Sequence, residues 1–177
     1  MDTAFNLDAV IRKVPDFPKK GILFYDITSI LMDPAAFAHC VSQMVSRYRS
    51  AGLDAIAAIE ARGFLFGAPL ALDLGLPLQL VRKQGKLPGE TVSLTYELEY
   101  GSDTVEMHQQ DLRPGERVLI VDDLIATGGT VRATVDLIER AGGSVHEVFC
   151  VIGLPFLEYE RRLAPVRVHT LLNYDSE

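Results

Sequence analysis

Residues 118–130 are Val118-Leu119-Ile120-Val121-Asp122-Asp123-Leu124-Ile125-Ala126-Thr127-Gly128-Gly129-Thr130, and this stretch decides the fold. Its first four residues are apolar β-formers, which predicts a buried strand. We expect the strand to end where the two carboxylates begin, and a short loop of small and hydroxyl residues to lead into a helix over 131–141. A strand, a loop and a helix in this order are typical of one unit of an α/β fold.

The same alternation continues on both sides of this stretch. Apolar runs predict further strands, and apolar residues at helical spacing predict further helices. The expected strands are 22–25, 54–59, 78–81, 145–152 and 166–172, and the expected helices are 5–13, 34–51 and 63–74. Short connections between them favour an α/β fold with a mostly parallel sheet flanked by helices. A chain of 177 residues fits a single domain over 1–177.

One segment, residues 83–108, departs from this alternation. Its first part is basic and rich in turn residues, while residues 92–100 and 104–108 alternate loosely between apolar and polar. Gly101-Ser102-Asp103 between these two runs favours a hairpin. A segment of this length outside the regular units suits a flexible loop that covers a binding site.

The composition is that of a globular protein, since 48% of the residues are hydrophobic and 23% are charged. The net charge of −7 comes without a basic stripe, which argues against nucleic acid as a partner. Cys40 and Cys150 lie among apolar neighbours, so we expect two buried thiols in a reducing compartment. We expect no signal peptide, and the longest charge-free apolar stretch, residues 63–72, is shorter than the ~20 residues that span a membrane. The expectation is a cytoplasmic protein with no membrane partner.

The loop after the strand at 118–121 carries groups suited to a phosphorylated sugar. In open α/β sheets, ligands bind beyond the carboxyl ends of the strands. Two glycines let the backbone approach a ligand, helix-start N–H groups attract phosphate, and two threonines add hydroxyl donors. Two aspartates only accept hydrogen bonds, so they suit sugar hydroxyls or a metal. These residues are Gly128, Gly129, Thr127 and Thr130 for the phosphate, and Asp122 and Asp123 for the sugar.

Taken singly, Asp123 or Gly128 is better explained as a helix cap or a turn residue, whereas the whole pattern favours a ribose 5-phosphate site. Common alternative motifs are missing from the sequence: the dinucleotide fingerprint, the P-loop, the serine hydrolase elbow and the zinc protease motif. The corresponding classes of enzyme therefore lack their usual local signature.

This stretch resembles the donor-binding signature of the type I phosphoribosyltransferases, which use 5-phosphoribosyl-1-pyrophosphate. The resemblance implies the fold of that family, with a small N-terminal hood at about residues 1–30 and a mobile catalytic loop at about residues 83–108. It also implies that Asp122 and Asp123 hold the ribose hydroxyls. The loop that holds the 5-phosphate would consist of Ala126, Thr127, Gly128, Gly129 and Thr130.

Three further segments resemble the adenine-specific members of this family. The first is Phe17-Pro18-Lys19-Lys20-Gly21-Ile22-Leu23-Phe24-Tyr25-Asp26-Ile27-Thr28, which is similar to the hood that covers the base. The resemblance implies that Phe24 stacks on adenine, while Leu23 and Tyr25 contact it through their backbone. Many members carry arginine at the position of Tyr25.

The other two segments are similar to the pyrophosphate-binding loops of the same members. Glu60-Ala61-Arg62-Gly63-Phe64 matches a loop in which the arginine meets pyrophosphate, a role that suits the guanidinium fork of Arg62. Arg82-Lys83-Gln84-Gly85-Lys86-Leu87-Pro88-Gly89, followed by Tyr96-Glu97-Leu98-Glu99-Tyr100-Gly101, matches the mobile catalytic loop. The implied roles are pyrophosphate binding by Arg82, Lys83 and Lys86, proton handling by Glu99, and a loop contribution from Tyr100. Without the resemblance, the basic residues fit a solvated run as well as an anion site.

The resemblance implies that adenine and 5-phosphoribosyl-1-pyrophosphate give AMP and pyrophosphate. It implies Mg²⁺ as cofactor, bound mainly through the substrate phosphates rather than by protein ligands, and a homodimer. One alternative is transfer to another base, such as hypoxanthine, guanine, xanthine or orotate, against which the hood and residues 99–101 argue. A second alternative is a non-catalytic regulator of the same fold that binds the donor, against which the acidic charge argues.

Overall fold

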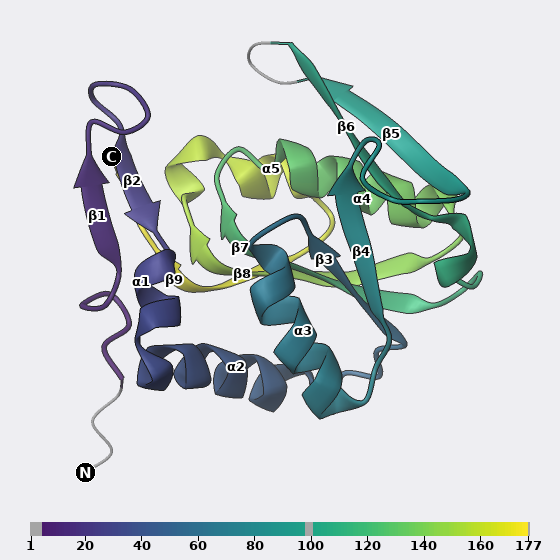
Figure 1. Ribbon diagram of the computed structural model, residues 1–177, viewed down its shortest axis with the longest axis horizontal. Helices are drawn as coiled ribbons and strands as arrows, with labels where there is room; N and C mark the ends of the chain where they lie inside the picture. The colour runs from purple at the N-terminus through teal and green to yellow at the C-terminus, as the bar shows by residue number, and fades with distance from the viewer. Residues whose placement is uncertain (1–4, 98–100, 177) are drawn as a thin grey trace.

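The structure is a computed structural model that describes residues 5–97 and 101–176, and Figure 1 shows how its elements are arranged. The strands are β1 (Arg12–Pro15), β2 (Leu23–Asp26), β3 (Ala55–Ile59), β4 (Leu78–Lys83), β5 (Thr91–Glu97), β6 (Ser102–His108), β7 (Arg117–Ile125), β8 (Ser144–Gly153) and β9 (Val168–Asn173). The helices are α1 (Thr28–Met32), α2 (Pro34–Tyr48), α3 (Gly63–Leu74), α4 (Gly129–Arg140) and α5 (Tyr159–Leu163), with short 3-10 helices at Gln109–Asp111 and Pro155–Leu157.

A seven-stranded sheet forms the centre of the molecule, in the order β5-β6-β4-β3-β7-β8-β9. Neighbours from β4 to β9 pair in parallel, whereas β5 and β6 pair in antiparallel at one edge. Helices α2 and α3 cover one face of this sheet, and α4 lies on the other (Figure 1). The expected α/β architecture with a mostly parallel sheet is therefore confirmed.

The apolar run of strand β7 is explained by its burial on both faces of the sheet. Leu119 and Val121 belong to the core under α2 and α3, while Val118 and Ile120 belong to the core under α4. All four side chains are fully buried. A strand that is covered on both faces needs apolar residues at successive positions, which is why this run is continuous rather than alternating.

The predicted end of this strand was wrong. β7 continues through Asp122 and Asp123 to Ile125, so both carboxylates belong to the strand and not to the loop. The reason is the neighbouring strand β8, whose ladder with β7 reaches the pair Ile125–Gly153. The ladder therefore fixes the backbone of both aspartates, and only the residues after Ile125 form the loop.

The predicted helix over 5–13 was also wrong. Leu7 and Ile11 are buried at helical spacing, yet the chain around them makes turns. Residues 12–15 then form β1, which pairs in antiparallel with β2 in a separate two-stranded sheet. This sheet stands beside the main sheet (left in Figure 1), and we call β1, β2 and the loop between them the hood.

The hairpin expected around Gly101 is confirmed. β5 and β6 pair from Thr91–His108 to Glu97–Ser102, and β6 joins the main sheet through β4. The hairpin rises beside the carboxyl end of β7, opposite the hood (Figure 1). Among the helices of the described residues, none combines the length and the hydrophobicity that crossing a membrane requires.

Candidate active site

A cavity of about 240 Å³ opens beyond the carboxyl end of β7. Its walls come from the end of β7, the loop after it, the start of α4, the loop between β3 and α3, and the end of β4. The structure thus brings together residues that are far apart in the sequence. The predicted site residues that line it are Arg62, Lys83, Asp122, Asp123, Ala126, Thr127, Gly128, Gly129 and Thr130.

The loop before α4 is shaped for an anion. Gly128 has a φ of 76°, and a side chain there would lie 3.2 Å from Cβ of Tyr159, so only glycine fits this turn well. Gly129 then begins α4, whose first turn has no side-chain cap. The uncapped N–H groups at a helix start carry partial positive charge, which suits a phosphate.

The two carboxylates of β7 lie on the floor of the cavity. Asp123 is 3% exposed, and its Oδ2 accepts a hydrogen bond from Nε of Arg62 at 2.5 Å. Oδ1 of Asp122 accepts from the backbone N–H of Asp123 at 2.8 Å. Burial and then the negative charge of Asp123 raise the pKa of Asp122 well above its ordinary value. Two adjacent carboxyl groups thus line the cavity, and their oxygens can accept hydrogen bonds from the hydroxyls of a bound sugar.

Gly63 explains how Arg62 reaches Asp123. A side chain at position 63 would lie 2.7 Å from the carbonyl oxygen of Val121 and 3.1 Å from Cα of Asp122. Because glycine has no side chain, the start of α3 packs directly on β7. This close approach places the guanidinium of Arg62 over the carboxyl end of the strand.

The basic residues of β4 and the turn after it divide into two groups. Lys83 lines the cavity and donates to Asp103 and, at 3.2 Å, to the hydroxyl of Tyr96. Arg82 instead donates to Glu60 at 3.1 Å and to the carbonyl of Lys86 at 2.9 Å. Arg82 and Lys86 do not line this cavity, so the structure brings only Lys83 of the three to the predicted pyrophosphate site.

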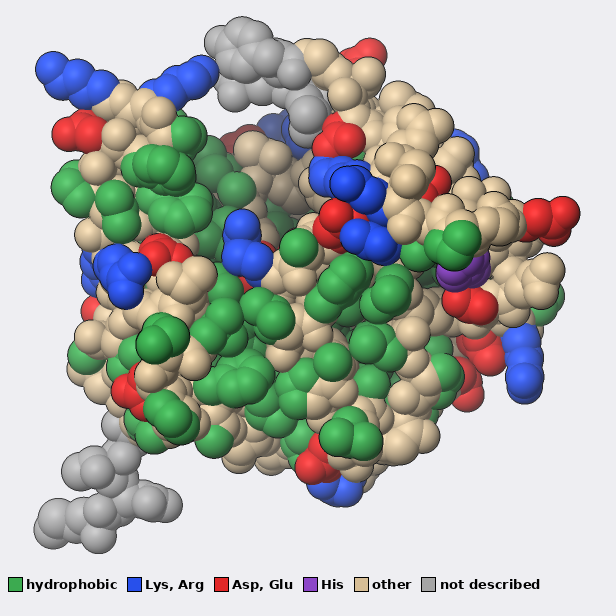
Figure 2. All heavy atoms as spheres, in the orientation of Figure 1, with side chains coloured by type: hydrophobic (Ala, Val, Ile, Leu, Met, Phe, Trp, Pro, Cys, Tyr) green, Lys and Arg blue, Asp and Glu red, His purple; other side chains and the backbone are tan. Residues whose placement is uncertain are grey.

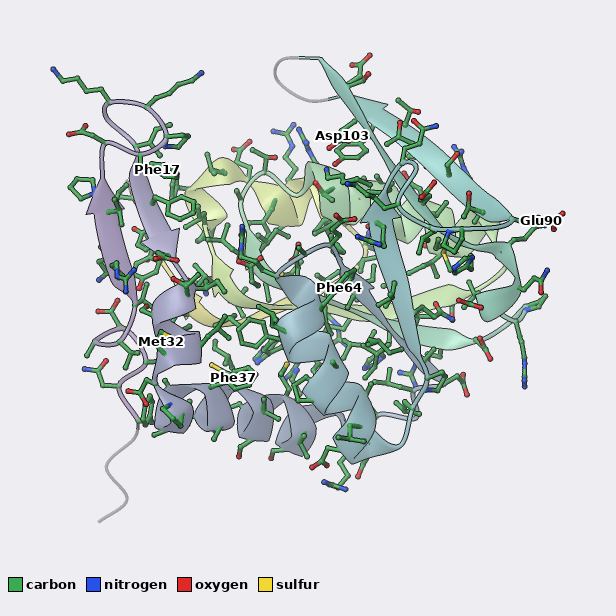
Figure 3. All side chains as sticks on the ribbon, in the orientation of Figure 1. Phe17, Met32, Phe37, Phe64, Glu90 and Asp103 are labelled. Carbon is green, nitrogen blue, oxygen red and sulfur yellow. The ribbon has the colours of Figure 1, made fainter. Side chains whose placement is uncertain are left out.

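A second and more apolar cavity, of about 600 Å³, lies under the hood. Phe24 lines it together with Phe17, and the two rings meet edge to face with centroids 5.0 Å apart. Arg62 lines this cavity as well as the polar one, so the two cavities meet at its side chain. Figure 2 shows a hollow between the hood and the hairpin, and Figure 3 labels Phe17 on one side and Asp103 on the other.

The side chains of Leu23 and Tyr25, the neighbours of Phe24, do not line the apolar cavity. Tyr25 is 6% exposed, and its ring stacks on Tyr174 with centroids 3.9 Å apart. Leu23 is half-buried and packs against the core under α2 and α3. Any contact of these two residues with a ligand in this cavity therefore has to come from their backbone.

Sequence reasoning missed several polar residues that organise the site. Glu60 holds Arg82, and the buried Glu106 accepts from the backbone N–H groups of Lys86 and Leu87 at 2.9 Å. Tyr96 and Asp103 lie opposite each other in the hairpin register. The hairpin prediction could have revealed that last pair, since the turn fixes which residues face each other.

Glu99 and Tyr100 lie outside the described residues. Within the described parts of the chain, no group of three or more His, Cys, Asp or Glu residues is placed to hold a metal ion.

Comparison with known proteins identifies the family. Residues 26–172 match the model of the phosphoribosyl transferase domain. The adenine phosphoribosyltransferase of Treponema denticola is 55% identical over 97% of this chain and 90% of its own length. That of Haemophilus influenzae is 52% identical over 94% of this chain and 93% of its own length.

Solved structures agree with this assignment. The adenine phosphoribosyltransferase of Thermoanaerobacter pseudethanolicus superimposes with a TM-score of 0.91 at 47% identity, covering 95% of this chain and 98% of its own. The enzyme of Saccharomyces cerevisiae, solved with adenine and an imino-altritol bisphosphate, gives a TM-score of 0.88 at 40% identity, covering 94% and 96%. The expected type I phosphoribosyltransferase fold is confirmed. The chain belongs to the phosphoribosyltransferase family, among the adenine phosphoribosyltransferases.

Proposed function

We propose that the two joined cavities carry out adenine phosphoribosyl transfer, in which adenine and 5-phosphoribosyl-1-pyrophosphate give AMP and pyrophosphate. The reaction is the one for which the relatives are named. The observation that carries the assignment of the site is that Arg62 lines both cavities. A polar cavity for the donor and an apolar cavity for the base meet there, as a reaction between a sugar and a purine requires.

The polar cavity is proposed to bind the sugar phosphate. Residues 126–130 surround the 5-phosphate with backbone N–H groups, and Thr127 and Thr130 add hydroxyl donors. Asp122 and Asp123 accept hydrogen bonds from the ribose hydroxyls. The position of both aspartates in the β7 ladder supports this role, because a rigid backbone holds the sugar still while the reaction proceeds.

Pyrophosphate is proposed to bind between Arg62 and Lys83, on the other side of the cavity. Within the described residues only Nε of Arg62 is hydrogen-bonded, which leaves its two terminal nitrogens for an anion. Arg82 and Lys86 join this site only if the turn after β4 moves, because Arg82 first has to leave Glu60. Their role is therefore proposed for the closed state of the loop at 83–108.

Adenine is proposed to lie in the apolar cavity against the ring of Phe24. Phe17, half-exposed at the mouth of this cavity, is a second aromatic contact. The backbones of Leu23 and Tyr25 read the edge of the base, since β2 belongs to a two-stranded sheet and so has one unpaired edge. The side chain of Tyr25 is not proposed to contact the base, because its ring stacks on Tyr174.

The chemistry follows from these positions. The anomeric carbon exchanges an oxygen leaving group for N9 of adenine, and such centres pass through an oxocarbenium-like transition state. Asp122 and Asp123 hold the ribose as it becomes positive, while Arg62 and Lys83 stabilise the departing pyrophosphate. Glu99 is proposed to take the proton from N9, and closure of the hairpin excludes water that would hydrolyse the donor.

Mg²⁺ fits the groups at this site. Carboxylate oxygens suit this ion, and three carboxylates line the cavity: Asp122, Asp123, which is bonded to Arg62, and Glu60, which is bonded to Arg82. We propose that the ion takes most of its ligands from substrate phosphates and water. When bound, it neutralises negative charge on the pyrophosphate.

A homodimer is proposed to form through the face made by α2 and α3. α3 is apolar on nearly all sides, which is typical of a helix that is covered all round, yet Leu65 and Leu72 are 42% and 86% exposed. Figure 2 shows hydrophobic side chains gathered over these two helices. Light scattering tests this proposal: Leu72→Glu should convert a dimer into a monomer, and a monomeric unmodified protein would contradict it.

We place the reaction in the cytoplasm, consistent with the free buried thiols of Cys40 and Cys150.

Pyrophosphate release from 5-phosphoribosyl-1-pyrophosphate tests the function as a whole. The purified protein is given adenine, hypoxanthine, guanine, xanthine or orotate in separate reactions with Mg²⁺. We expect release with adenine far above every other base. Release with a different base would indicate another specificity, and donor binding without release would indicate a regulator.

A further inference from the structure

Tyr96 joins three parts of the site that are separate in the sequence. It lies on β5, on the same side of the hairpin as the buried Leu94, and its ring faces the start of α4. Its hydroxyl lies 2.9 Å from Oγ1 of Thr130, 3.2 Å from Nζ of Lys83 and 3.3 Å from Oδ2 of Asp103. The hairpin, the end of β4 and the phosphate loop therefore meet at one oxygen atom.

The direction of these hydrogen bonds follows from proton counting. The ammonium group of Lys83 can only donate, so the oxygen of Tyr96 accepts from it. The single hydrogen of the tyrosine hydroxyl goes to the carboxylate of Asp103, which can only accept, at 3.3 Å. In the bond of 2.9 Å to Thr130 the threonine hydroxyl is then the donor, so Tyr96 fixes the orientation of the Thr130 side chain.

We infer that Tyr96 is a positioning residue for the donor: its hydroxyl holds the side chain of Thr130 in place at the proposed phosphate site and fastens the hairpin to residues 126–130. The inference rests on the proposed role of residues 126–130. Lys83 and Asp103 hold the tyrosine oxygen in place, because Lys83 donates to it and Asp103 accepts its hydrogen. Tyr96 thereby connects the end of β4 and the hairpin to Thr130.

Binding of separate ligands tests this role. Tyr96→Phe removes one oxygen and keeps the ring, so the hairpin still packs on α4. We expect the dissociation constant of ribose 5-phosphate to rise roughly 3- to 10-fold, the loss of about one hydrogen bond. The KM for adenine should stay within about twofold, since the hydrogen bonds of Tyr96 to the described residues go to Lys83, Asp103 and Thr130, outside the hood. An unchanged affinity for ribose 5-phosphate, or equal losses for both ligands, would overturn the inference.

Thr95→Val is the matched control on the same hairpin. Thr95 bonds to Thr104 across the hairpin at 2.9 Å, on the exposed side away from the phosphate loop. We expect no change in the affinity for ribose 5-phosphate. A loss equal to that of Tyr96→Phe would mean that any weakening of the hairpin produces the effect, and would contradict a specific role of Tyr96.

A double-mutant cycle separates failure of the inference from failure of the proposed site. Thr130→Val alone should weaken the binding of ribose 5-phosphate. Adding Tyr96→Phe should weaken this binding no further, because the hydrogen bond between the two hydroxyls is already lost. If the second change keeps its full effect, Tyr96 acts by another route and the inference is wrong. If Thr130→Val has no effect, the phosphate loop itself is wrongly assigned.

Discussion

The guanidinium of Arg62 is bonded to the buried carboxylate of Asp123 at the point where the polar and apolar cavities meet. Arg62 lies at the start of α3 and Asp123 near the end of β7, so the pair joins two elements that are adjacent in space only. Among the described residues only Nε of the guanidinium is hydrogen-bonded, so the arginine can hold the carboxylate and still present its terminal nitrogens to an anion. We propose that Arg62 both balances the charge of Asp123 and binds pyrophosphate.

Arg62→Ala should selectively weaken the binding of pyrophosphate in the back reaction, which starts from AMP and pyrophosphate. Loss of a charge-assisted contact predicts that the KM for pyrophosphate rises roughly 10- to 100-fold, with a smaller change in the KM for AMP. Arg161→Ala, at an arginine that is 87% exposed, is the control and should change neither value. Equal losses for both ligands would assign Arg62 a purely structural role.

The double substitution Asp122→Asn and Asp123→Asn should weaken binding of the donor, 5-phosphoribosyl-1-pyrophosphate. Carboxylates accept stronger hydrogen bonds from sugar hydroxyls than amides do, so we expect the dissociation constant of 5-phosphoribosyl-1-pyrophosphate to rise roughly 10- to 100-fold. Titration calorimetry with the donor and without adenine measures this directly. An unaffected constant would refute the assignment of the ribose hydroxyls.

Asp122→Asn alone should make the protein more stable. The pKa of Asp122 is raised in the folded protein, so above that pKa the native state buries a charge that the unfolded state exposes to water. We expect a gain in the free energy of unfolding at pH 8, which disappears as the pH falls below the ordinary aspartate pKa of about 4. Urea unfolding at fixed protein concentration checks this, and a loss of stability at pH 8 would contradict it.

Phe24→Ala should raise the KM for adenine more than the KM for the donor. Stacking of a base on an aromatic ring contributes about 1–3 kcal/mol, which predicts an increase of roughly 5-fold or more. Tyr25→Phe is the matched control at the next residue, and it should leave adenine unaffected because that ring stacks on Tyr174. A larger effect on the donor than on adenine would rule out stacking by Phe24.

Glu99→Ala should lower turnover while leaving donor binding nearly intact. Loss of a group that handles a proton in the transition state predicts a decrease in kcat of roughly 100-fold or more. Glu97→Ala, at an exposed residue on the same hairpin, is the control and should keep full turnover. Unchanged turnover in Glu99→Ala would remove this residue from the mechanism.

Much of the fold could be predicted because its signals are local. The apolar run at 118–121 and the glycines at 128 and 129 each constrain a short piece of chain. Together they were enough to predict the βα unit. The end of β7 could not be predicted, because pairing with β8 extends the strand through polar residues. The spacing of the buried Leu7 and Ile11 predicted a helix wrongly, because a series of turns can bury residues at the same spacing.

The site could be predicted in part for the same reason. Asp122, Asp123 and the phosphate loop form one continuous motif, and Arg62 and Lys83 follow from family resemblance. The bonds of Arg82 to Glu60 and of Tyr96 to Thr130 join residues far apart in the sequence, and no local pattern encodes them. Such contacts depend on how β4, β5 and the phosphate loop pack together.

A crystal structure with AMP bound tests the central claim most directly, because AMP contains both the 5-phosphate and the base. The account predicts phosphate oxygens within hydrogen-bonding distance of the backbone N–H groups of residues 127–130, ribose hydroxyls on Asp122 and Asp123, and adenine against Phe24. A phosphate bound elsewhere, with the loop before α4 closed by neighbouring side chains, would contradict it.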